Sequence, residues 1–310
     1  MDRKERRMTL TALAILVLAA TAGAHGGDPM TITIERKTCR AADGVELVYS
    51  TAGAGEPALV FIHGGMANRG FYDGQLKAFA GRHRVIAPDL PGHGESGSNR
   101  TKWGIPEWGA DVKAVLDAEK VNTFIIFGNS LGGPVAVETA LLCPGRVLGV
   151  VGVDTFQQID FVMTAEEVGP RAKAFGDDYA AALKEMIGLL FHKDADPALV
   201  ADAEKRMSGT PPEAARAMLL GMAGYDHGAS VRRLAAPLRA INGDLYPTDI
   251  EGSRKLKPDF DAVVMTHVGH YPMLERPQEF NRLVAEMVAG LTKVRVSSSG
   301  LFSGHHPDDP

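Results

Sequence analysis

The sequence is poor in cysteine and has no concentrated positive charge. Only two of its 310 residues are Cys, and neither Cys39 nor Cys143 has the spacing of a metal or redox motif. We expect two unpaired, mostly buried thiols, with one disulfide as the alternative. Lys and Arg number 33 against 38 Asp and Glu, for a net charge of −5, which argues against nucleic acid as a partner.

Nucleotide and metal motifs are missing as well. The glycine-rich Pro91-Gly92-His93-Gly94 lacks the Lys-Ser/Thr of a phosphate-binding loop. We therefore expect no cofactor and no metal site. The oligomeric state cannot be predicted from the sequence.

The two ends of the chain are expected to lie outside the fold. A basic-leaning start precedes an apolar run from Met8 to about Ala24 that ends in small residues, which predicts a cleavable signal peptide at 1–24. The protein would then be secreted or periplasmic and free of the membrane after cleavage, with an uncleaved N-terminal membrane anchor as the alternative. The segment 297–310 is rich in Ser, Gly, His, Asp and Pro and is predicted to be disordered.

Between these ends, buried-looking strands alternate with helical stretches. Apolar and polar residues alternate on both sides of Ala42-Asp43-Gly44, which predicts a hairpin of two strands. Apolar runs and 3.6-residue periodicity predict the strands 58–63, 84–88, 122–128, 147–154, 237–242 and 262–266, and the helices 71–80, 106–119, 131–142 and 277–291. This pattern predicts an α/β protein with a mostly parallel central sheet covered on both faces.

One long interruption has no convincing strand. Residues 155–236 read as several helices, and they split the predicted core into 28–154 and 237–292. Asp196-Pro197 predicts one helix start, and Thr210 with Glu213 predicts a capping box at another. An inserted helical cap over the sheet would explain this region.

The chemistry is expected where strands end. Gly128-Asn129-Ser130-Leu131-Gly132 follows an apolar strand and opens a helix, which is the setting of an exposed serine nucleophile. A serine hydroxyl needs a base, and His270, just after the last predicted strand, is the best candidate. A carboxylate should orient that base; Asp244, after the preceding strand, is the first choice, with Asp154 and Asp249 as alternatives.

A developing negative charge on the substrate oxygen also needs hydrogen-bond donors. The backbone N–H groups of Gly65 and Leu131, at two strand ends, are the candidates. His63, just before this glycine pair, could be mistaken for a catalytic base. We interpret it as a structural residue.

At this point the chain resembles the α/β-hydrolase fold family, in its serine-nucleophile, capped, esterase- or lipase-like form. The resemblance rests on His63-Gly64-Gly65, on Pro88–Ser96, on the turn at Ser130 and on Gly269-His270, which occur in the family's order. It implies an α/β-hydrolase fold whose helical cap follows Asp154. One departure concerns the acid, because relatives commonly place it where this chain has Tyr246.

The serine at position 130 excludes the aspartate-based routes of dehalogenases and epoxide hydrolases. It predicts a serine hydrolase that cleaves a small or medium carboxylic ester, a lactone or a thioester with an apolar acyl group, through an acyl-enzyme. A carbon–carbon bond hydrolase, a cofactor-free haloperoxidase or perhydrolase, an iminopeptidase and an acyltransferase remain open on the same triad. A non-catalytic ligand receptor on the same scaffold is the alternative from another class.

Overall fold

The computed structural model describes residues 32–299, with side chains through residue 293. The expected signal peptide at 1–24 and residues 300–310 of the expected tail lie outside the described residues. The last helix runs from Pro277 to Ser299, so the segment 297–299, which we expected to be disordered, lies in that helix. No helix within the described range is long and apolar enough to cross a membrane.

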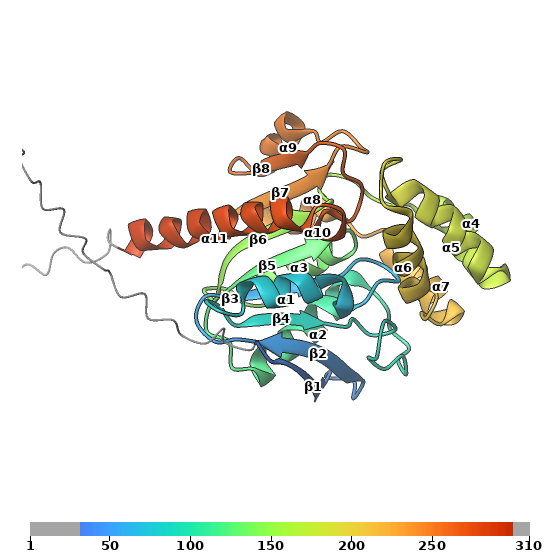
Figure 1. The fold of residues 1–310 in the computed structure, drawn as a ribbon, viewed down its shortest axis with the longest axis horizontal. Helices are drawn as coiled ribbons and strands as arrows, with labels where there is room; N and C mark the ends of the chain where they lie inside the picture. Colours follow the sequence, from blue (N-terminus) through green and yellow to red (C-terminus); the bar gives the residue numbers. More distant parts are fainter. Residues whose placement is uncertain (1–31, 300–310) are drawn as a thin grey trace, which may run out of the picture. The chain divides into compact units, whose positions relative to one another are not determined.

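A single mixed sheet forms the centre of the described region (Figure 1). Its order is β1-β2-β4-β3-β5-β6-β7-β8, in which β2 pairs antiparallel with both β1 and β4, and β3 to β8 pair parallel with one another. The bounds are β1 Ile34–Arg40, β2 Glu46–Ala52, β3 Ala58–Ile62, β4 Val85–Pro88, β5 Phe124–Asn129, β6 Val147–Val153, β7 Leu238–Gly243 and β8 Asp261–Met265. The prediction of a mostly parallel sheet is confirmed.

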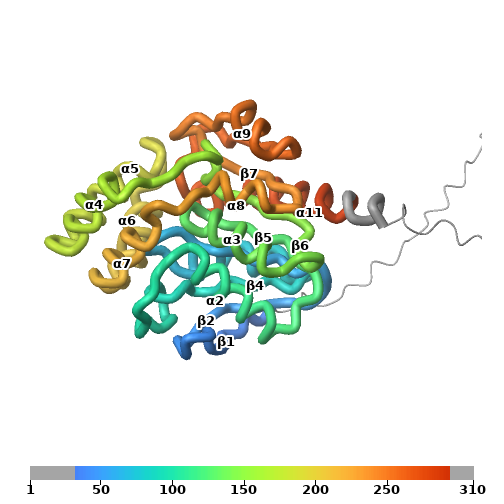
Figure 2. Tube along the Cα trace, turned by 180° about the vertical axis from the view of Figure 1, so that it is seen from behind, coloured from blue at the N-terminus to red at the C-terminus, as the bar shows by residue number. Residues whose placement is uncertain are grey.

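Helices cover both faces of this sheet. Figure 1 shows α1 (Asp73–Phe79), α10 (Pro272–Glu275) and α11 (Pro277–Ser299) on the near face. The 3-10 turn η1 (Arg69–Tyr72) directly precedes α1. Figure 2 shows α2 (Ile105–Ala118), α3 (Gly132–Leu141) and α8 (His227–Arg233) on the opposite face. The short helix α9 (Ile250–Leu256) lies beside β8.

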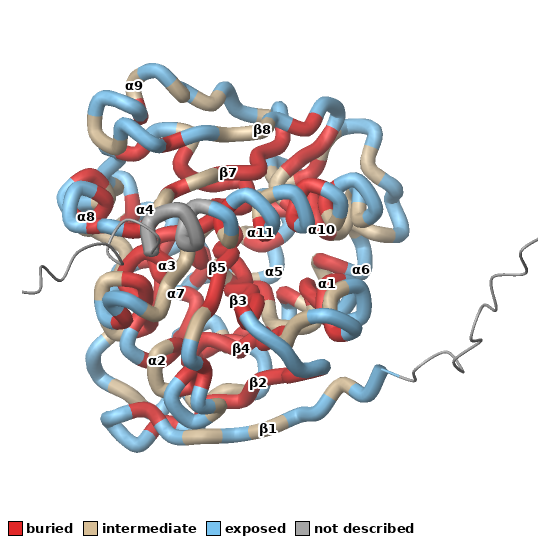
Figure 3. The backbone as a smooth tube through the Cα atoms, turned by 90° about the vertical axis from the view of Figure 1, so that its left-hand side faces the viewer, coloured by how far each residue is buried: buried red, intermediate tan, exposed pale blue. Residues whose placement is uncertain are grey.

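Burial follows from this layering. Every residue of β3 and β5 is buried, whereas β1 at the sheet edge is largely exposed (Figure 3). A strand covered on both faces needs a continuous apolar run, which is what the sequence has at these two strands. Phe61 and Phe127 stack across the neighbouring strands with ring centroids 4.8 Å apart. Each fully buried side chain of this size contributes roughly 1.5–3 kcal/mol.

The stretch 155–236 contains five helices and no strand among its described residues. Four of them, α4 (Ala165–Asp177), α5 (Tyr179–Leu190), α6 (Pro197–Met207) and α7 (Pro212–Met222), lie together at one end of the sheet (Figure 1). We call these four helices the cap. The fifth, α8, packs against α3 instead.

Two predicted helix starts in the cap have different outcomes. Asp196 accepts the N–H of Ala198 at 2.9 Å and begins α6, as predicted. The capping box of Thr210 with Glu213 is wrong, because Pro211 occupies the cap position of α7 and makes no side-chain cap. The Thr210 hydroxyl instead donates to the carbonyl of Met66 at 3.0 Å, which ties the cap to the loop after β3.

Both cysteines are free thiols. Cys39 lies on β1 and Cys143 is buried just beyond α3. Burial raises the pKa of Cys39 to about 11. A thiol with a raised pKa is a poor nucleophile at neutral pH. The alternative of one disulfide between Cys39 and Cys143 is therefore wrong, since both thiols are free.

Candidate active site

Ser130 stands in a tight turn between β5 and α3. Its φ is 52°, in the left-handed region that side chains other than glycine rarely adopt. The flanking glycines are required by space, since a Cβ at Gly128 would lie 2.0 Å from the carbonyl oxygen of Gly132. A Cβ at Gly132 would in turn lie 2.6 Å from the carbonyl oxygen of Ile62. The turn can therefore form only because both positions are glycine.

Backbone strain gathers at the ends of the parallel strands. Six non-glycine residues among those described have a positive φ, and all but Lys120 lie in loops that follow β3, β5, β6 or β8: Met66, Ser130, Asp154, Phe156 and His267. Such conformations cost of order 1–3 kcal/mol each and persist where the surroundings hold them. This concentration makes the carboxyl edge of the sheet the candidate functional edge.

The carboxylate that meets the candidate base is Asp154. Its Oδ2 lies 2.5 Å from Nδ1 of His270, and its Oδ1 accepts the N–H of Gly243 at 2.9 Å. The Asp154 side chain is 2% exposed and that of His270 is 13% exposed. A buried carboxylate needs such partners, and here one of them is the imidazole. Asp154, which the sequence analysis gave as an alternative, is therefore the carboxylate that contacts His270.

The expectation that Asp244 orients His270 is wrong. The Asp244 carboxylate accepts the backbone N–H groups of His267 and Val268 at 2.9 and 3.2 Å, and these bonds hold the loop ahead of the base. They lower the pKa of Asp244 below its usual value. Asp249 does not reach His270 either, because its carboxylate accepts the N–H of Gly252 and begins α9.

Two backbone N–H groups are available beside Ser130. Among the described residues, neither the N–H of Gly65 nor that of Leu131 donates to a protein acceptor. The loop of Gly65 adjoins the serine, since a Cβ on Gly64 would lie 3.2 Å from Cβ of Ser130. Leu131 is the N-cap residue of α3, and free N–H groups are expected at the start of a helix. Both donors fit the predicted role in binding an oxyanion.

His63 is a structural residue, as the sequence indicates. Its Nε2 accepts the N–H of Leu90 at 3.0 Å, so the proton of the neutral ring is on Nδ1, which lies 2.7 Å from the carbonyl of Gly64. Complete burial lowers the pKa of His63 to about 4. A ring whose two nitrogens are both occupied in this way has no free position for a substrate.

Two asparagines join the loops of the site, and sequence reasoning missed both. Asn129 donates from Nδ2 to the carbonyls of Val153 and His270, both at 2.9 Å. Asn242 accepts the N–H of Thr155 at 3.2 Å and donates to the hydroxyl of Thr248 at 2.9 Å. A fully buried amide at the end of an apolar strand is the signal that could have revealed them, because a buried polar group needs hydrogen-bond partners.

Ser130, Asp154 and His270 line one cavity of about 550 Å³ beneath the cap. No hydrogen bond joins the Ser130 hydroxyl to the His270 ring among the described side chains, and in free enzymes this contact is often long. The cavity's apolar wall is formed by Leu131, Pro134, Phe156, Phe161, Met163, Leu190 and Met222, and its polar groups include Gln157, Gln158, Arg171, His227 and Tyr246. Burial lowers the pKa of His227 to about 4, so that ring is neutral at pH 7.

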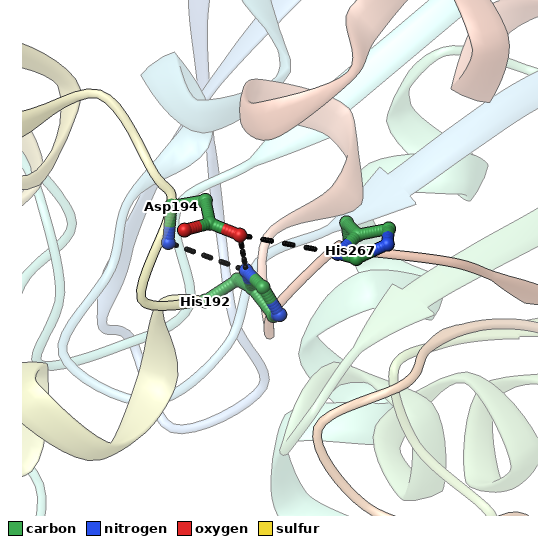
Figure 4. A group of neighbouring side chains, drawn as sticks. All are labelled: His192, Asp194 and His267. Carbon is green, nitrogen blue, oxygen red and sulfur yellow. Dashed lines mark hydrogen bonds and ion pairs between the residues drawn. The ribbon is translucent and has the colours of Figure 1, made fainter.

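A second polar cluster lies outside this cavity. His192 and Asp194, on the segment between α5 and α6, approach His267 on the loop after β8 (Figure 4). One ligand atom from each residue lies within 4.8 Å of the others. The sequence separates His267 from the other two by more than seventy positions, so no local spacing could predict the cluster.

This fold and this edge of the sheet define a protein of the α/β-hydrolase type. The model of the alpha/beta hydrolase family matches residues 59–283, and the chain belongs to that family. The predicted resemblance is thereby confirmed.

Named relatives include esterases and other hydrolases. A pimeloyl-[acyl-carrier protein] methyl ester esterase from Nitrosospira multiformis is 27% identical over 255 residues, which cover 76% of this chain and 95% of that protein. A candidate carbamate hydrolase, RutD of Azorhizobium caulinodans, is 34% identical over 150 residues, or 48% of this chain. This chain spans 50% of that relative's length. Among solved structures, Est816, described as an N-acyl homoserine lactone degrading enzyme, has a TM-score of 0.66 at 29% identity, covering 79% of this chain and 97% of that one.

Proposed function

We propose that this protein is a serine hydrolase that cleaves small or medium carboxylic esters, including lactones and thioesters, through an acyl-enzyme. The observation that carries the proposal is the buried Asp154–His270 pair on the same cavity wall as the strained Ser130. An alcohol next to an imidazole that is itself bonded to a carboxylate forms the triad that activates serine for attack on a carbonyl. The esterase from Nitrosospira multiformis and the lactone-degrading Est816 support this reaction class.

The mechanism follows from the positions of these groups. Ser130 Oγ attacks the acyl carbon while His270 takes its proton, and the Asp154 carboxylate stabilises the resulting imidazolium. The N–H groups of Gly65 and Leu131 stabilise the oxyanion of the tetrahedral intermediate. His270 then protonates the leaving alcohol or thiol, and the acyl group remains on Ser130.

Water completes the cycle. His270 accepts a proton from a water molecule that attacks the acyl-enzyme, and it returns that proton to Ser130 as the acid is released. The apolar wall formed by Phe156, Phe161, Met163 and Met222 suits an aliphatic or aromatic acyl chain.

We also propose that the protein acts outside the cytoplasm, since the segment 1–24 carries the pattern of an export signal.

Replacing Ser130 with Ala tests the proposal. Alanine keeps the Cβ atom and the backbone strain of the turn but removes the nucleophile, so kcat toward a p-nitrophenyl ester should fall by about 10⁴-fold or more. Ser208→Ala is the matched control, because this residue is exposed and its hydroxyl, among the described residues, donates only to the carbonyl of Lys205. Hydrolysis that persists unchanged in Ser130→Ala, with the control active, would refute the assignment.

A further inference from the structure

The cluster of His192, Asp194 and His267 has the composition of a transition-metal site. Oδ2 of Asp194 lies 3.4 Å from Nδ1 of His192 and 3.9 Å from Nδ1 of His267 (Figure 4). Two imidazoles and one carboxylate are a ligand set used by Zn²⁺, with bonds of about 2.0–2.2 Å. In a tetrahedral site such bonds place neighbouring ligand atoms roughly 3.3 Å apart. The shorter distance already matches this value, and the longer one needs a shift of less than an ångström.

Both histidine positions are held by bonds that do not use the metal-binding face. The N–H of His267 donates to Asp244, which fixes that residue's backbone at a φ of 56°. The backbone carbonyl of His192 accepts the N–H of Ala195 at 2.9 Å. Ligands that need little reordering bind a metal more tightly, because the entropy of placing them has been lost already on folding.

The imidazole of His192 presents the correct form for coordination. Its Nδ1 accepts the backbone N–H of Asp194 at 3.2 Å, so Nδ1 carries no proton and its lone pair is available to a metal that displaces this bond. Metal binding would replace this long hydrogen bond with a coordinate bond. The rings of His192 and His267 already pack edge to face, with centroids 5.4 Å apart.

The electrostatic surroundings favour a cation. A hollow of about 400 Å³ beside Asp194 and His267 is also lined by Asp196, Glu275 and Arg276, so three carboxylates face one guanidinium. A net negative surround increases the local concentration of a divalent cation. The hollow also leaves space for solvent to complete the coordination of the metal.

We propose that His192, Asp194 and His267 bind one Zn²⁺ ion, which joins the cap to the loop that carries His270. The two segments are already in contact, because the N–H of His270 donates to the carbonyl of Leu190 at 2.7 Å. A metal ion bound at His192, two residues after Leu190, would stabilise this contact from outside the cavity that Ser130 lines. The site is distinct from Ser130 and takes no part in the ester chemistry.

Zinc titration of the whole protein tests the site. His305 and His306 could bind metal by themselves, so the parent for this experiment carries His305→Gln and His306→Gln. After chelator treatment, competition with a chromophoric zinc indicator should show one Zn²⁺ per chain. His192→Gln, Asp194→Asn and His267→Gln should each weaken the affinity by about tenfold or more, the loss that even outer-shell changes at metal sites cause.

Two further variants serve as matched controls. His83→Gln and Asp202→Asn remove an imidazole and a carboxylate outside the cluster, and zinc affinity should stay at the parent value in both. Because the His267 side chain is 67% exposed, His267→Gln will fold even where another ligand variant does not. Equal affinity in the parent and in His267→Gln, or stoichiometric binding only when His305 and His306 are present, would overturn the proposal.

Hydrogen exchange provides a readout of the fastening itself. Added Zn²⁺ should slow amide exchange in the segment 191–195 and in the loop 266–270 of the parent. The same amides should not respond in His267→Gln. Zinc binding that leaves exchange at both segments unchanged would contradict the role of the ion as a link between the cap and this loop.

Discussion

Asp154 and Asp244 follow the neighbouring strands β6 and β7, yet their surroundings are opposite. Asp154 is 3% exposed, lines the cavity and bonds to His270, whereas Asp244 is exposed and bonds to two backbone N–H groups. The carboxylate nearer the middle of the sheet therefore meets the imidazole, and the outer one holds the loop that presents it. The strand that each aspartate follows therefore determines its role, and its distance from His270 along the chain does not.

The largest expected effect is the difference in kcat between the variants in which each carboxylate in turn is replaced by an amide. Asp154→Asn should lower kcat by about 10⁴-fold, because an amide cannot stabilise the imidazolium and favours the wrong tautomer of His270. Asp244→Asn should leave kcat near the parent value. Steady-state kinetics on a p-nitrophenyl ester, with thermal unfolding to show that both variants fold, checks the pair. A large loss in Asp244→Asn with an active Asp154→Asn would reverse the comparison.

Gly243 lies between the two carboxylates and donates its N–H to Asp154. A Cβ at this position would lie 2.3 Å from the carbonyl of Val268 and 2.4 Å from that of Gly269. Gly243→Ala should therefore destabilise the fold by about 1–3 kcal/mol and lower kcat/KM by moving the His270 loop. Urea unfolding measures the first effect and kinetics the second.

Gly290→Ala is the control for this substitution. Gly290 lies in α11, and within the described part of the chain a Cβ there meets no atom within 4 Å beyond its neighbours and the backbone of its own helix, so the change should stabilise the protein by roughly 0.5–1 kcal/mol. Gly243→Ala with the stability and kcat/KM of the parent would show that the crowded turn does not position the site.

A smaller effect tests whether the cavity lined by Asp154 recognises a charge on the substrate. Arg171, on α4, lines the same cavity as Asp154. Arg171→Gln should raise KM by roughly fivefold, about 1 kcal/mol, for an ester whose acyl chain ends in a carboxylate. The neutral ester of equal length should be unaffected, and Lys173→Gln on the same helix should change neither value. Equal changes for both esters in Arg171→Gln would exclude charge recognition by this residue.

The smallest expected effect concerns Asp244 and pH. Backbone N–H groups lower the pKa of Asp244 from its ordinary value near 3.8, so its ionised form binds the loop more strongly in the folded state. This stability is fully present above about pH 4 and is lost as the pH falls through the folded pKa. Because the group is exposed, the contribution should be below about 1 kcal/mol.

Urea unfolding at a series of pH values checks the sign of this effect. The parent should be more stable than Asp244→Asn at pH 6, and the difference should shrink as the pH falls below 4. A difference that grows on acidification would show that the hydrogen bonds of Asp244 do not favour its charged form.

The sequence predicted the sheet and the serine turn well because both depend on local patterns. Continuous apolar runs located β3 and β5, and the Gly-x-Ser-x-Gly pattern located the turn, although Gly128 is crowded by the nearby Gly132 and Gly132 by the distant carbonyl of Ile62. The choice of carboxylate could not be made in the same way. It depends on how the loop after β8 folds back over β6, and on the N–H of Gly243, neither of which is local to Asp154.

The cap illustrates the same limit. Asp196 predicted the start of α6 because its partner, Ala198, is two residues away. Thr210 failed as a helix cap because α7 begins one residue later, after Pro211, and the Thr210 hydroxyl donates to the distant carbonyl of Met66. The cluster of His192, Asp194 and His267 is a third case, since its members meet only when the cap lies against the loop after β8.

The most direct test of the central claim is to locate a covalent adduct. The protein is treated with a fluorophosphonate, digested and analysed by mass spectrometry, with Ser130→Ala treated in parallel. A single adduct is expected on the peptide that contains Ser130, and no adduct is expected in the variant. An adduct on another residue, or equal labelling of both proteins, would contradict the claim.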